Sequence, residues 1–223
     1  MSLSLNEKTL ELNISAEFLH ICRHFDPKAF IFGTTLQQES SPGFGYDSRV
    51  LGRLPPFWRA AVFQFKRAVQ RISNTPLGDE YKFFINNNGK SDQHLILYNM
   101  CGARHRVAFY VLPLFITLND VRNAAPNLLQ HTLFADVADI PPHFIDRAPH
   151  TMLVYPQHLI GIILSERIEI KLIQIEELVK IIGEKKIGMP IEELLENLRM
   201  GKIKPWEKPS KRPRFTFQIF PSR

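Results

Sequence analysis

The chain has 223 residues, and its 28 Lys and Arg exceed its 22 Asp and Glu by 6. This length allows one well-filled core with a small appended subdomain, and a hydrophobic fraction of 44% with 17 Phe excludes a disordered chain. The positive balance is compatible with nucleic acid or another polyanion as a partner, although many basic proteins bind neither.

The cysteines are Cys22 and Cys101, far apart and without a CxxC pair. This spacing excludes a disulfide framework and a cysteine zinc site, and it is typical of a protein in a reducing cytoplasm. The polar amino-terminal stretch lacks the apolar run of a secretory signal, and the most apolar run, Val107 to Ile116, is too short to span a bilayer. We therefore expect a soluble cytoplasmic protein with no membrane partner.

The first expected element is a helix over Ile14 to His24, with Ser15 as its N-cap and apolar residues at near-helical spacing. A glycine-rich turn then precedes a strand over Tyr46 to Leu51. An apolar run from Trp58 to Lys66 predicts a second strand, and Arg67 to Glu80 reads as a polar connection.

A strand over Tyr81 to Asn86 is followed by a helix over Asp92 to Cys101, with Ser91 as its N-cap and His94 on its polar face. The next segment, Arg106 to Leu112, is almost continuously apolar, as in a strand buried on both faces. A helix followed by a buried strand is the alternation of an α/β core.

The pattern is weaker in the second half of the chain. Thr117 to Ala125 predicts a short helix, and Leu128 to Ala138 fits either a helix or a strand. His150 to Tyr155 predicts a strand, and Gly161 to Ile173 a strand or a pair of strands.

Two amphipathic helices are expected near the carboxyl end, over Ile175 to Ile182 and over Ile191 to Met200. A basic tail with interleaved aromatic residues follows, from Gly201 to Arg223. We therefore predict an α/β protein with a central mixed β-sheet flanked by helices. Residues 1–160 would form its core, and residues 161–223 a strand and helical extension that ends in the basic tail.

Side-chain alternation along the strand from Trp58 to Lys66 separates two sets of residues. Phe63 and Phe65 point to one face, where we expect a core, so Gln64 and Lys66 emerge together on the other face. An acidic residue, Asp47, lies in the strand before. A carboxylate, an amide oxygen and an ammonium that converge at strand ends suit metal-assisted attack on a phosphate.

Asp47 followed by Gln64-Phe65-Lys66 resembles the motif of the PD-(D/E)XK nuclease-like superfamily, an acid on one strand and a (D/E)XK triplet on the next. The order of elements from about Ile14 to Leu112 is also similar to that family. The resemblance implies a restriction-endonuclease-like core, with Glu39 as the acidic residue that often lies upstream. The departure is Gln64, which stands where most members carry Asp or Glu.

The resemblance implies Mg²⁺- or Mn²⁺-dependent hydrolysis of phosphodiester bonds, most often in DNA. Asp47 would be the principal metal ligand, with the side-chain oxygen of Gln64 and the backbone carbonyl of Phe65 beside it. Replacing a carboxylate by an amide removes one negative charge, which weakens metal affinity unless Glu39 compensates. Lys66 would position the attacking water and neutralise charge on the phosphate.

Two basic groups are candidates for contact with nucleic acid. Arg104 and Arg106 precede the buried strand and could line a phosphate-binding face, or they could be solvated surface residues. The tail suits phosphate contacts and base stacking on Trp206, or it packs its aromatic residues on the domain or on a partner subunit. Its basic residues are Lys202, Lys204, Lys208, Lys211, Arg212 and Arg214.

These observations leave two functions of different kinds. The first is a metal-dependent nuclease, and the second is a non-catalytic nucleic-acid-binding or protein-interaction module that keeps the fold with a degraded site. Gln64 is the residue that keeps the second interpretation open. Assembly into a homo-oligomer through the carboxyl-terminal helices is compatible with both.

Overall fold

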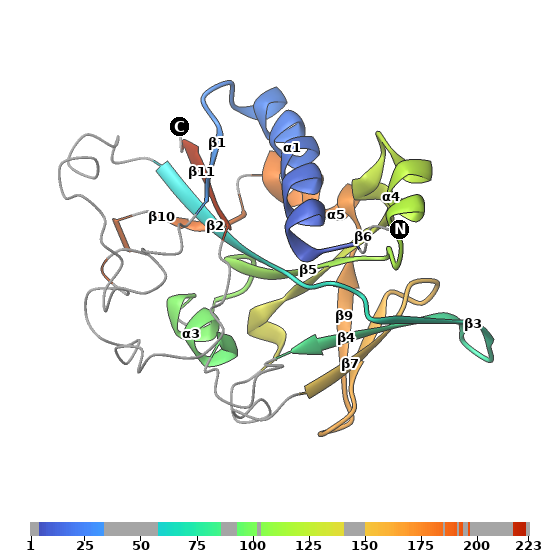
Figure 1. The fold of residues 1–223 in the computed structure, drawn as a ribbon. Helices are drawn as coiled ribbons and strands as arrows, with labels where there is room; N and C mark the ends of the chain where they lie inside the picture. Colours follow the sequence, from blue (N-terminus) through green and yellow to red (C-terminus); the bar gives the residue numbers. More distant parts are fainter. Residues whose placement is uncertain are drawn as a thin grey trace.

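The computed structural model describes residues 5–33, 58–85, 93–101, 104–140, 150–184, 186–190, 192–193, 196 and 216–221. Its helices are α1 (Glu7–Phe25), α3 (Gln93–Met100), α4 (Leu118–Ala124) and α5 (Ile175–Gly183), with the 3-10 helices η1 (Leu128–His131) and η2 (Val137–Asp139) (Figure 1). The strands are β1 (Phe30–Gly33), β2 (Trp58–Phe65), β3 (Gln70–Thr75), β4 (Gly78–Ile85), β5 (Ala108–Pro113), β6 (Thr132–Asp136), β7 (His150–Tyr155), β8 (Ile160–Ile163), β9 (Ile168–Ile173), β10 (Met189–Pro190) and β11 (Thr216–Pro221).

These strands form one mixed sheet in the order β1-β11-β2-β5-β6-β9-β8-β7-β4-β3, with β10 added beside β2. β2 and β5 run parallel, and the other described pairs are antiparallel. The chain between β2 and β5 contains the β3–β4 hairpin and α3. A mixed sheet with helices on its faces belongs to the α/β class, as predicted.

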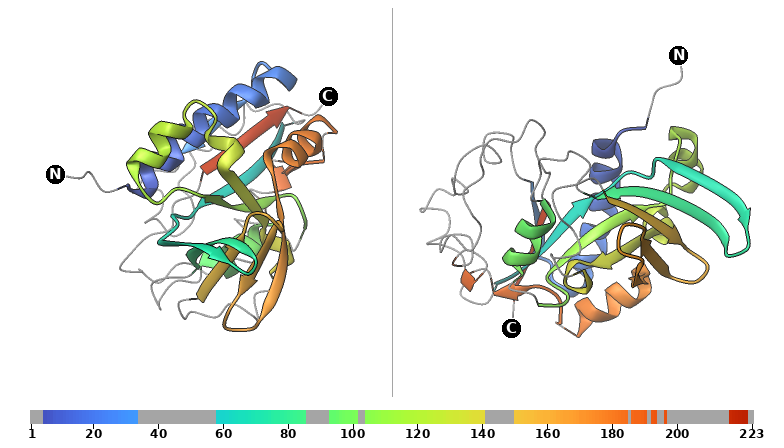
Figure 2. Two further views of the ribbon diagram at one scale, coloured as in Figure 1. Left: turned by 90° about the vertical axis from the view of Figure 1, so that its right-hand side faces the viewer. Right: turned by 90° about the horizontal axis from the view of Figure 1, so that it is seen from below.

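The sheet separates two hydrophobic cores. Figure 1 shows α1, α4 and α5 on one side of the central strands and α3 on the other. Residues of β4 and β7 pack into the same core as residues of β2 and β5, although β6, β9 and β8 lie between the two pairs in the sheet order. The sheet therefore curls over the α3 side, as the turned views also show (Figure 2).

Helix α1 begins earlier than the sequence predicted. Its N-cap is Asn6, whose side-chain oxygen accepts a hydrogen bond from the Thr9 amide at 2.7 Å, so the expected cap Ser15 lies inside the helix. The sequence predicted the wrong cap because the first turn of the helix is polar. The apolar residues that recur every four positions begin only after that turn. The buried members of this series are Leu10, Ile14, Phe18 and Cys22.

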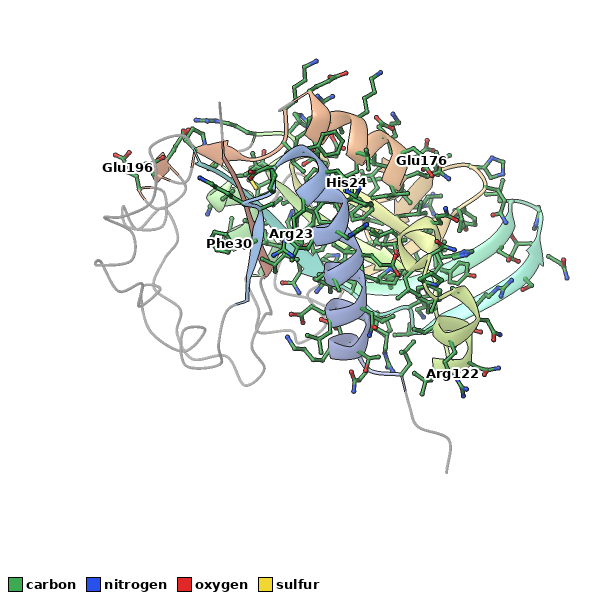
Figure 3. All side chains as sticks on the ribbon, turned by 90° about the horizontal axis from the view of Figure 1, so that it is seen from above. Arg23, His24, Phe30, Arg122, Glu176 and Glu196 are labelled. Carbon is green, nitrogen blue, oxygen red and sulfur yellow. The ribbon has the colours of Figure 1, made fainter. Side chains whose placement is uncertain are left out.

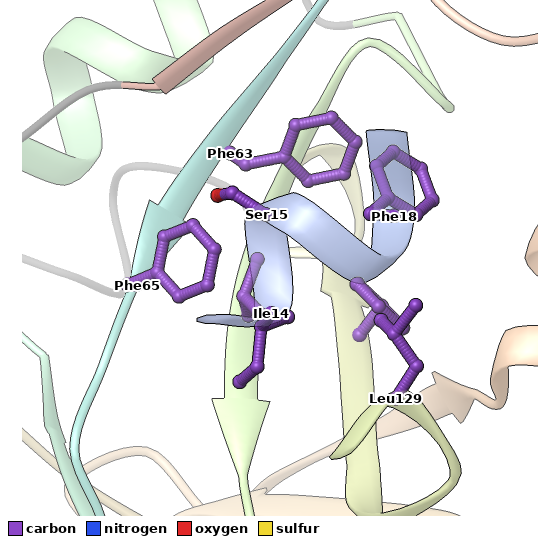
Figure 4. A pocket seen from close by; sticks show the side chains of 8 residues that line it. Ile14, Ser15, Phe18, Phe63, Phe65 and Leu129 are labelled. Atoms are coloured by element: carbon purple, nitrogen blue, oxygen red, sulfur yellow. The ribbon is translucent and has the colours of Figure 1, made fainter. Parts of the chain in front are cut away.

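Aromatic packing ties α1 to β2. The ring of Phe63 meets Phe18 edge-on at 5.1 Å between centroids and stacks on Phe109 at 5.7 Å. Phe63 and Phe65 also line a small apolar hollow beneath α1, together with Ile14 (Figure 4). One face of β2 is therefore buried in the core under the helix, as the alternation of side chains along this strand predicted.

The carboxyl end of α1 lies beside the start of β1. Figure 3 shows Arg23 near Phe30, and the Arg23 Nε donates a hydrogen bond to the Ala29 carbonyl at 3.3 Å. Arg23 and His24 occupy the last turn of the helix, where positive charge is favoured by the helix dipole.

Several predicted elements are confirmed. β2, β7, α4 and α5 match the predicted segments within one or two residues, and Gly161 to Ile173 is the β8–β9 hairpin. The ambiguous segment from Leu128 to Ala138 is η1, β6 and most of η2. The predicted strand over Tyr46 to Leu51 lies outside the described residues.

The prediction of a polar connection over Arg67 to Glu80 is wrong, because this segment forms β3 and the start of β4. β3 is an edge strand whose residues are nearly all exposed. An exposed edge strand needs no apolar alternation, so its sequence carries no strand periodicity.

The chain beyond residue 160 contributes to the same sheet. β8 begins at Ile160 and β9 pairs with β6, while β11 lies antiparallel between β1 and β2. The predicted boundary between residues 160 and 161 therefore falls inside β8. The described part of residues 161–223 contains most of β8, then β9, β10 and β11, together with α5.

The helices of the described residues include none that is long and apolar enough to cross a membrane.

Gly188 lies where the chain passes close to β2, with φ of +70°. A Cβ at this position would lie 2.4 Å from the Ala60 carbonyl oxygen, and the Gly188 amide donates to the Arg106 carbonyl at 2.6 Å. We expect Gly188→Ala to lower the free energy of unfolding by about 2 kcal/mol or more, measured by chemical denaturation. Gly183→Ala is the control, because its Cβ would meet only the Phe25 ring, and we expect a change within about 1 kcal/mol. Equal effects of the two substitutions would contradict this role of Gly188.

Candidate functional site

The described residues bring two members of the predicted motif together. Gln64 and Lys66 lie on the face of β2 opposite Phe63 and Phe65, and Gln64 is in register with Tyr110 of β5. Asp47 and Glu39 lie outside the described residues. So do the predicted basic residues of the tail, Lys202, Lys204, Lys208, Lys211, Arg212 and Arg214.

The second face of β2 is a core and not an open surface. Ala60, Val62 and Tyr110 belong to the hydrophobic core on this side, and Gln64 and Lys66 are only 1% and 7% exposed. Both polar side chains have therefore lost most of their contact with water, which is unfavourable unless the protein supplies other partners.

The side-chain amide of Gln64 forms only part of the hydrogen bonds that it could form. Its Nε2 donates a hydrogen bond to the Phe65 carbonyl at 3.2 Å, and its Oε1 is buried with no hydrogen-bond partner among the described residues. A buried acceptor left in this state costs about 1–3 kcal/mol. The amide oxygen is one of the hard oxygen ligands that Mg²⁺ or Mn²⁺ accepts, so Gln64 fits the predicted metal role. The Phe65 carbonyl, the other predicted ligand, is occupied by the Gln64 amide.

Lys66 lies at the end of β2, with its backbone amide bonded to the Val111 carbonyl at 3.0 Å. Its Nζ is 5.6 Å from the centroid of the Tyr110 ring. Burial lowers the pKa of Lys66 to about 8, and the charge of Glu7 acts in the opposite direction. The neutral and charged forms of this amine therefore coexist slightly above neutral pH.

His94 completes this group, and the prediction that it lies on the polar face of its helix is wrong. The imidazole is fully buried, with Nδ1 2.9 Å from the Tyr110 hydroxyl and Nε2 2.6 Å from the Ile140 carbonyl. Burial lowers the pKa of His94 to about 4. The sequence shows only one His among apolar residues on a short helix. This pattern does not tell whether the imidazole lies on the buried or on the exposed face of the helix.

The two predicted phosphate-binding arginines of the described residues have different surroundings. Arg104 is exposed and forms a two-pronged ion pair with Glu193, which raises the pKa of Arg104. Arg106 has φ of +65°, and its backbone amide donates to the Asp136 carboxylate at 2.6 Å. A phosphate would have to compete with Glu193 for the Arg104 guanidinium.

A second polar group, which the sequence did not indicate, could hold a metal ion. It consists of His105, Asp136 and Asp139, with one ligand atom of each within 4.8 Å of the others. The His105 Nδ1 lies 3.5 Å from an oxygen of Asp136 and 3.3 Å from one of Asp139. Asp136 is buried, and burial is the main cause that raises its pKa. Its oxygens also accept backbone amides of Arg106 and Ala138, which fixes their orientation.

This second group lies away from Gln64 and Lys66. It is fixed at Arg106, before the amino end of β5, whereas Lys66 bonds to Val111 near the carboxyl end. The extended residues between them, from Ala108 to Val111, already span about 10 Å. An ion held by His105, Asp136 and Asp139 would therefore not be the ion that Gln64 contacts.

The pH dependence of stability tests the burial of Lys66. Its folded-state pKa of about 8 lies below the unfolded value, so the unfolded chain binds the proton between these values and wild-type stability rises with pH across that window. Lys66→Met removes this term, so we expect the stability of the variant relative to wild type to fall by about 2 kcal/mol between pH 7 and pH 10. Lys82→Met is the control, because Lys82 lies similarly over the Phe84 ring, at 5.4 Å, on a partly exposed strand. A stability difference that does not change with pH would show that Lys66 is hydrated.

Metal titration distinguishes the two candidate positions. If His105, Asp136 and Asp139 hold a divalent ion, Mn²⁺ uptake followed by electron paramagnetic resonance should lose the contribution of that ion in His105→Ala and keep it in Gln64→Leu. His158→Ala replaces an exposed histidine outside the group and serves as the control. Uptake that is equal in His105→Ala and wild type would show that the ion does not bind there.

Comparison with known proteins finds no matching family model, no matching curated protein and no matching solved structure. The residues of this chain that bear on its function lie above all on the buried face that carries Gln64, Lys66, His94 and Tyr110.

Proposed function

We propose that the protein is a metal-dependent nuclease that hydrolyses phosphodiester bonds in DNA. The observation that carries the proposal is a pair of buried polar side chains on one face of β2. Gln64 presents an oxygen with no hydrogen-bond partner among the described residues, and burial lowers the pKa of the Lys66 amine to about 8. Burial of these two polar groups lowers the stability of the fold, so a functional reason for it is expected. The resemblance to the PD-(D/E)XK superfamily supplies a chemical role for both.

The topology around β2 supports a restriction-endonuclease-like core. In that interpretation β2 is the strand that carries the triplet, and α3 and the parallel strand β5 follow it. α1 packs on the opposite face of the sheet through Phe63. The β3–β4 hairpin, which precedes α3 in the chain, and the strands from β6 to β9 would be additions to that core.

The residues of the site suit Mg²⁺ or Mn²⁺ as the cofactor. Gln64 would bind it through Oε1, with Asp47 as the carboxylate ligand and Glu39 as a second acid that restores the charge missing at Gln64. The Phe65 carbonyl would take part once the Gln64 amide releases it. The bound ion would polarise the phosphate and lower the pKa of a bound water.

Lys66 can act in either of its protonation states. Its ammonium form would neutralise charge on the phosphate, and its amine form could accept a proton from the attacking water. Because burial brings its pKa to about 8, both forms are available near neutral pH, whereas an exposed lysine would be almost fully charged.

The alternative is a non-catalytic module that binds nucleic acid or protein. Two observations favour it: residue 64 is an amide instead of a carboxylate, and Arg104 is already paired with Glu193. In this case Gln64 and Lys66 would be remnants of a site, and basic residues of the tail would carry the binding.

Cleavage assays on plasmid and linear DNA with Mg²⁺ or Mn²⁺ test the proposal. We expect Lys66→Met to lower the cleavage rate by about 10²-fold or more, since this is the usual contribution of a positioned acid or base. Asp47→Asn should abolish cleavage through loss of the main ligand. Gln64→Glu should keep or raise the rate because it restores a carboxylate.

Lys82→Met controls for the loss of one positive charge over an aromatic ring and should cleave as wild type does. Cleavage that survives both Lys66→Met and Asp47→Asn would exclude this site. Salt-sensitive DNA binding without cleavage by any form would favour the non-catalytic module.

A further inference from the structure

Two histidines of α1 lie next to each other on its exposed surface. His20 and His24 are four positions apart, a spacing that places side chains on the same face of a helix in successive turns. Their ring centroids are 4.9 Å apart, with an interplanar angle of 82° between the rings. Both residues are exposed, so packing in a core does not account for the meeting of the rings.

A hydrogen bond orients the second of these rings. The Nδ1 of His24 lies 3.0 Å from the carbonyl oxygen of His20. A carbonyl oxygen only accepts hydrogen bonds, so this Nδ1 carries the proton, and in the neutral ring the lone pair is on Nε2. A histidine that binds a metal ion commonly donates its other ring N–H to a backbone carbonyl, which fixes the tautomer and the ring orientation. His24 has this arrangement.

The separation of the two rings fits a shared metal ion. An imidazole nitrogen binds Zn²⁺ at about 2.0–2.1 Å, and two rings bound to one ion at a tetrahedral angle would have centroids about 5 Å apart. The observed 4.9 Å between His20 and His24 agrees with this separation. An ion could therefore bind both rings without a change in the helix.

The polar groups nearest in the sequence are engaged elsewhere. Glu17, one turn earlier on the same side of α1, has its two carboxylate oxygens on the amides of Leu128 and Leu129, each at 3.0 Å. The Nε of Arg23 donates to the Ala29 carbonyl. The two imidazoles are also not part of a group of three or more potential ligands among the described residues. The described chain therefore offers this ion two ligands.

We propose that His20 and His24 form a surface site for a divalent transition-metal ion. Imidazole nitrogens favour Cu²⁺, Ni²⁺ and Zn²⁺, whereas Mg²⁺ and Mn²⁺ favour carboxylate, carbonyl and water oxygens. The ion joins two successive turns near the carboxyl end of α1, and water occupies its remaining coordination positions. Binding stabilises the folded chain, because the unfolded chain does not hold the two imidazoles together.

This site is separate from the other two candidate metal positions. α1 packs on the face of the sheet opposite to the core that encloses Gln64 and Lys66. The group of His105, Asp136 and Asp139 contains two carboxylates and shares no residue with the pair on α1. The site on α1 therefore does not depend on the proposed nuclease function, and its ion takes no part in the hydrolysis.

The test is a titration of the full-length, metal-free protein with Ni²⁺ at about pH 8, since metal binding requires neutral imidazoles. Calorimetry gives the affinity. NMR of the histidine rings gives the location, because bound paramagnetic Ni²⁺ broadens the resonances near it. The two rings are assigned by their absence in His20→Ala and His24→Ala. His158→Ala, which replaces an exposed histidine in a turn, is the control.

We expect the resonances of His20 and His24 to broaden together, at less than one equivalent of Ni²⁺ and before those of the other histidines. Each of His20→Ala and His24→Ala should weaken Ni²⁺ binding about tenfold or more, because a single ring loses the advantage of a second ligand held beside it. His158→Ala and His105→Ala should keep the wild-type affinity for this site. An excess of Mg²⁺ should not displace the bound Ni²⁺.

Two results would overturn the proposal. One is equal broadening of all exposed histidines, which would show independent weak binding to single imidazoles. The other is a wild-type affinity in both His20→Ala and His24→Ala. Alanine favours the helix at exposed positions, and a native NMR spectrum of each variant confirms that a loss of binding comes from the lost ligand and not from unfolding.

Discussion

The parallel pairing of β2 with β5 is the constraint on which the rest of the structure depends. Both strands are covered on both faces, by the core under α1 on one side and by the curled half of the sheet on the other. A polar side chain at an inward position of either strand therefore loses its water, whatever its role. Gln64, Lys66 and Tyr110 are polar residues in such positions, and they lie on the same face.

Burial of polar side chains lowers the stability of the fold and changes the chemical behaviour of the same groups. An amide oxygen with no hydrogen-bond partner in the described part of the chain and an amine with a lowered pKa each raise the free energy of the folded state. His94 shows the contrasting solution, since both its ring nitrogens are satisfied and the ring stays neutral. The face thus combines a satisfied pair with a buried amide and a buried amine of lowered pKa.

The central strands could be predicted because their buried positions carry apolar residues in a regular pattern along the sequence. Alternation placed Gln64 and Lys66 on one face of β2, and a continuous apolar run marked β5. β3 carries no such regular pattern because it is an exposed edge strand, and no local pattern indicates that β11 joins β1 and β2 from the far end of the chain. His94 escaped prediction because its burial depends on Ile140 and Tyr110, which are distant in sequence.

The position of the second polar group limits how the site could work. His105, Asp136 and Asp139 meet before the amino end of β5, while Lys66 borders its carboxyl end. Glu7, in the first turn of α1, is a carboxylate whose charge raises the pKa of Lys66. Because Gln64 brings no charge, the proposed phosphodiester chemistry would depend on a carboxylate from Asp47 or Glu39. The difference between a nuclease and a binding module therefore rests on these two acids more than on Gln64, since an amide oxygen can complete a metal site but cannot supply its negative charge.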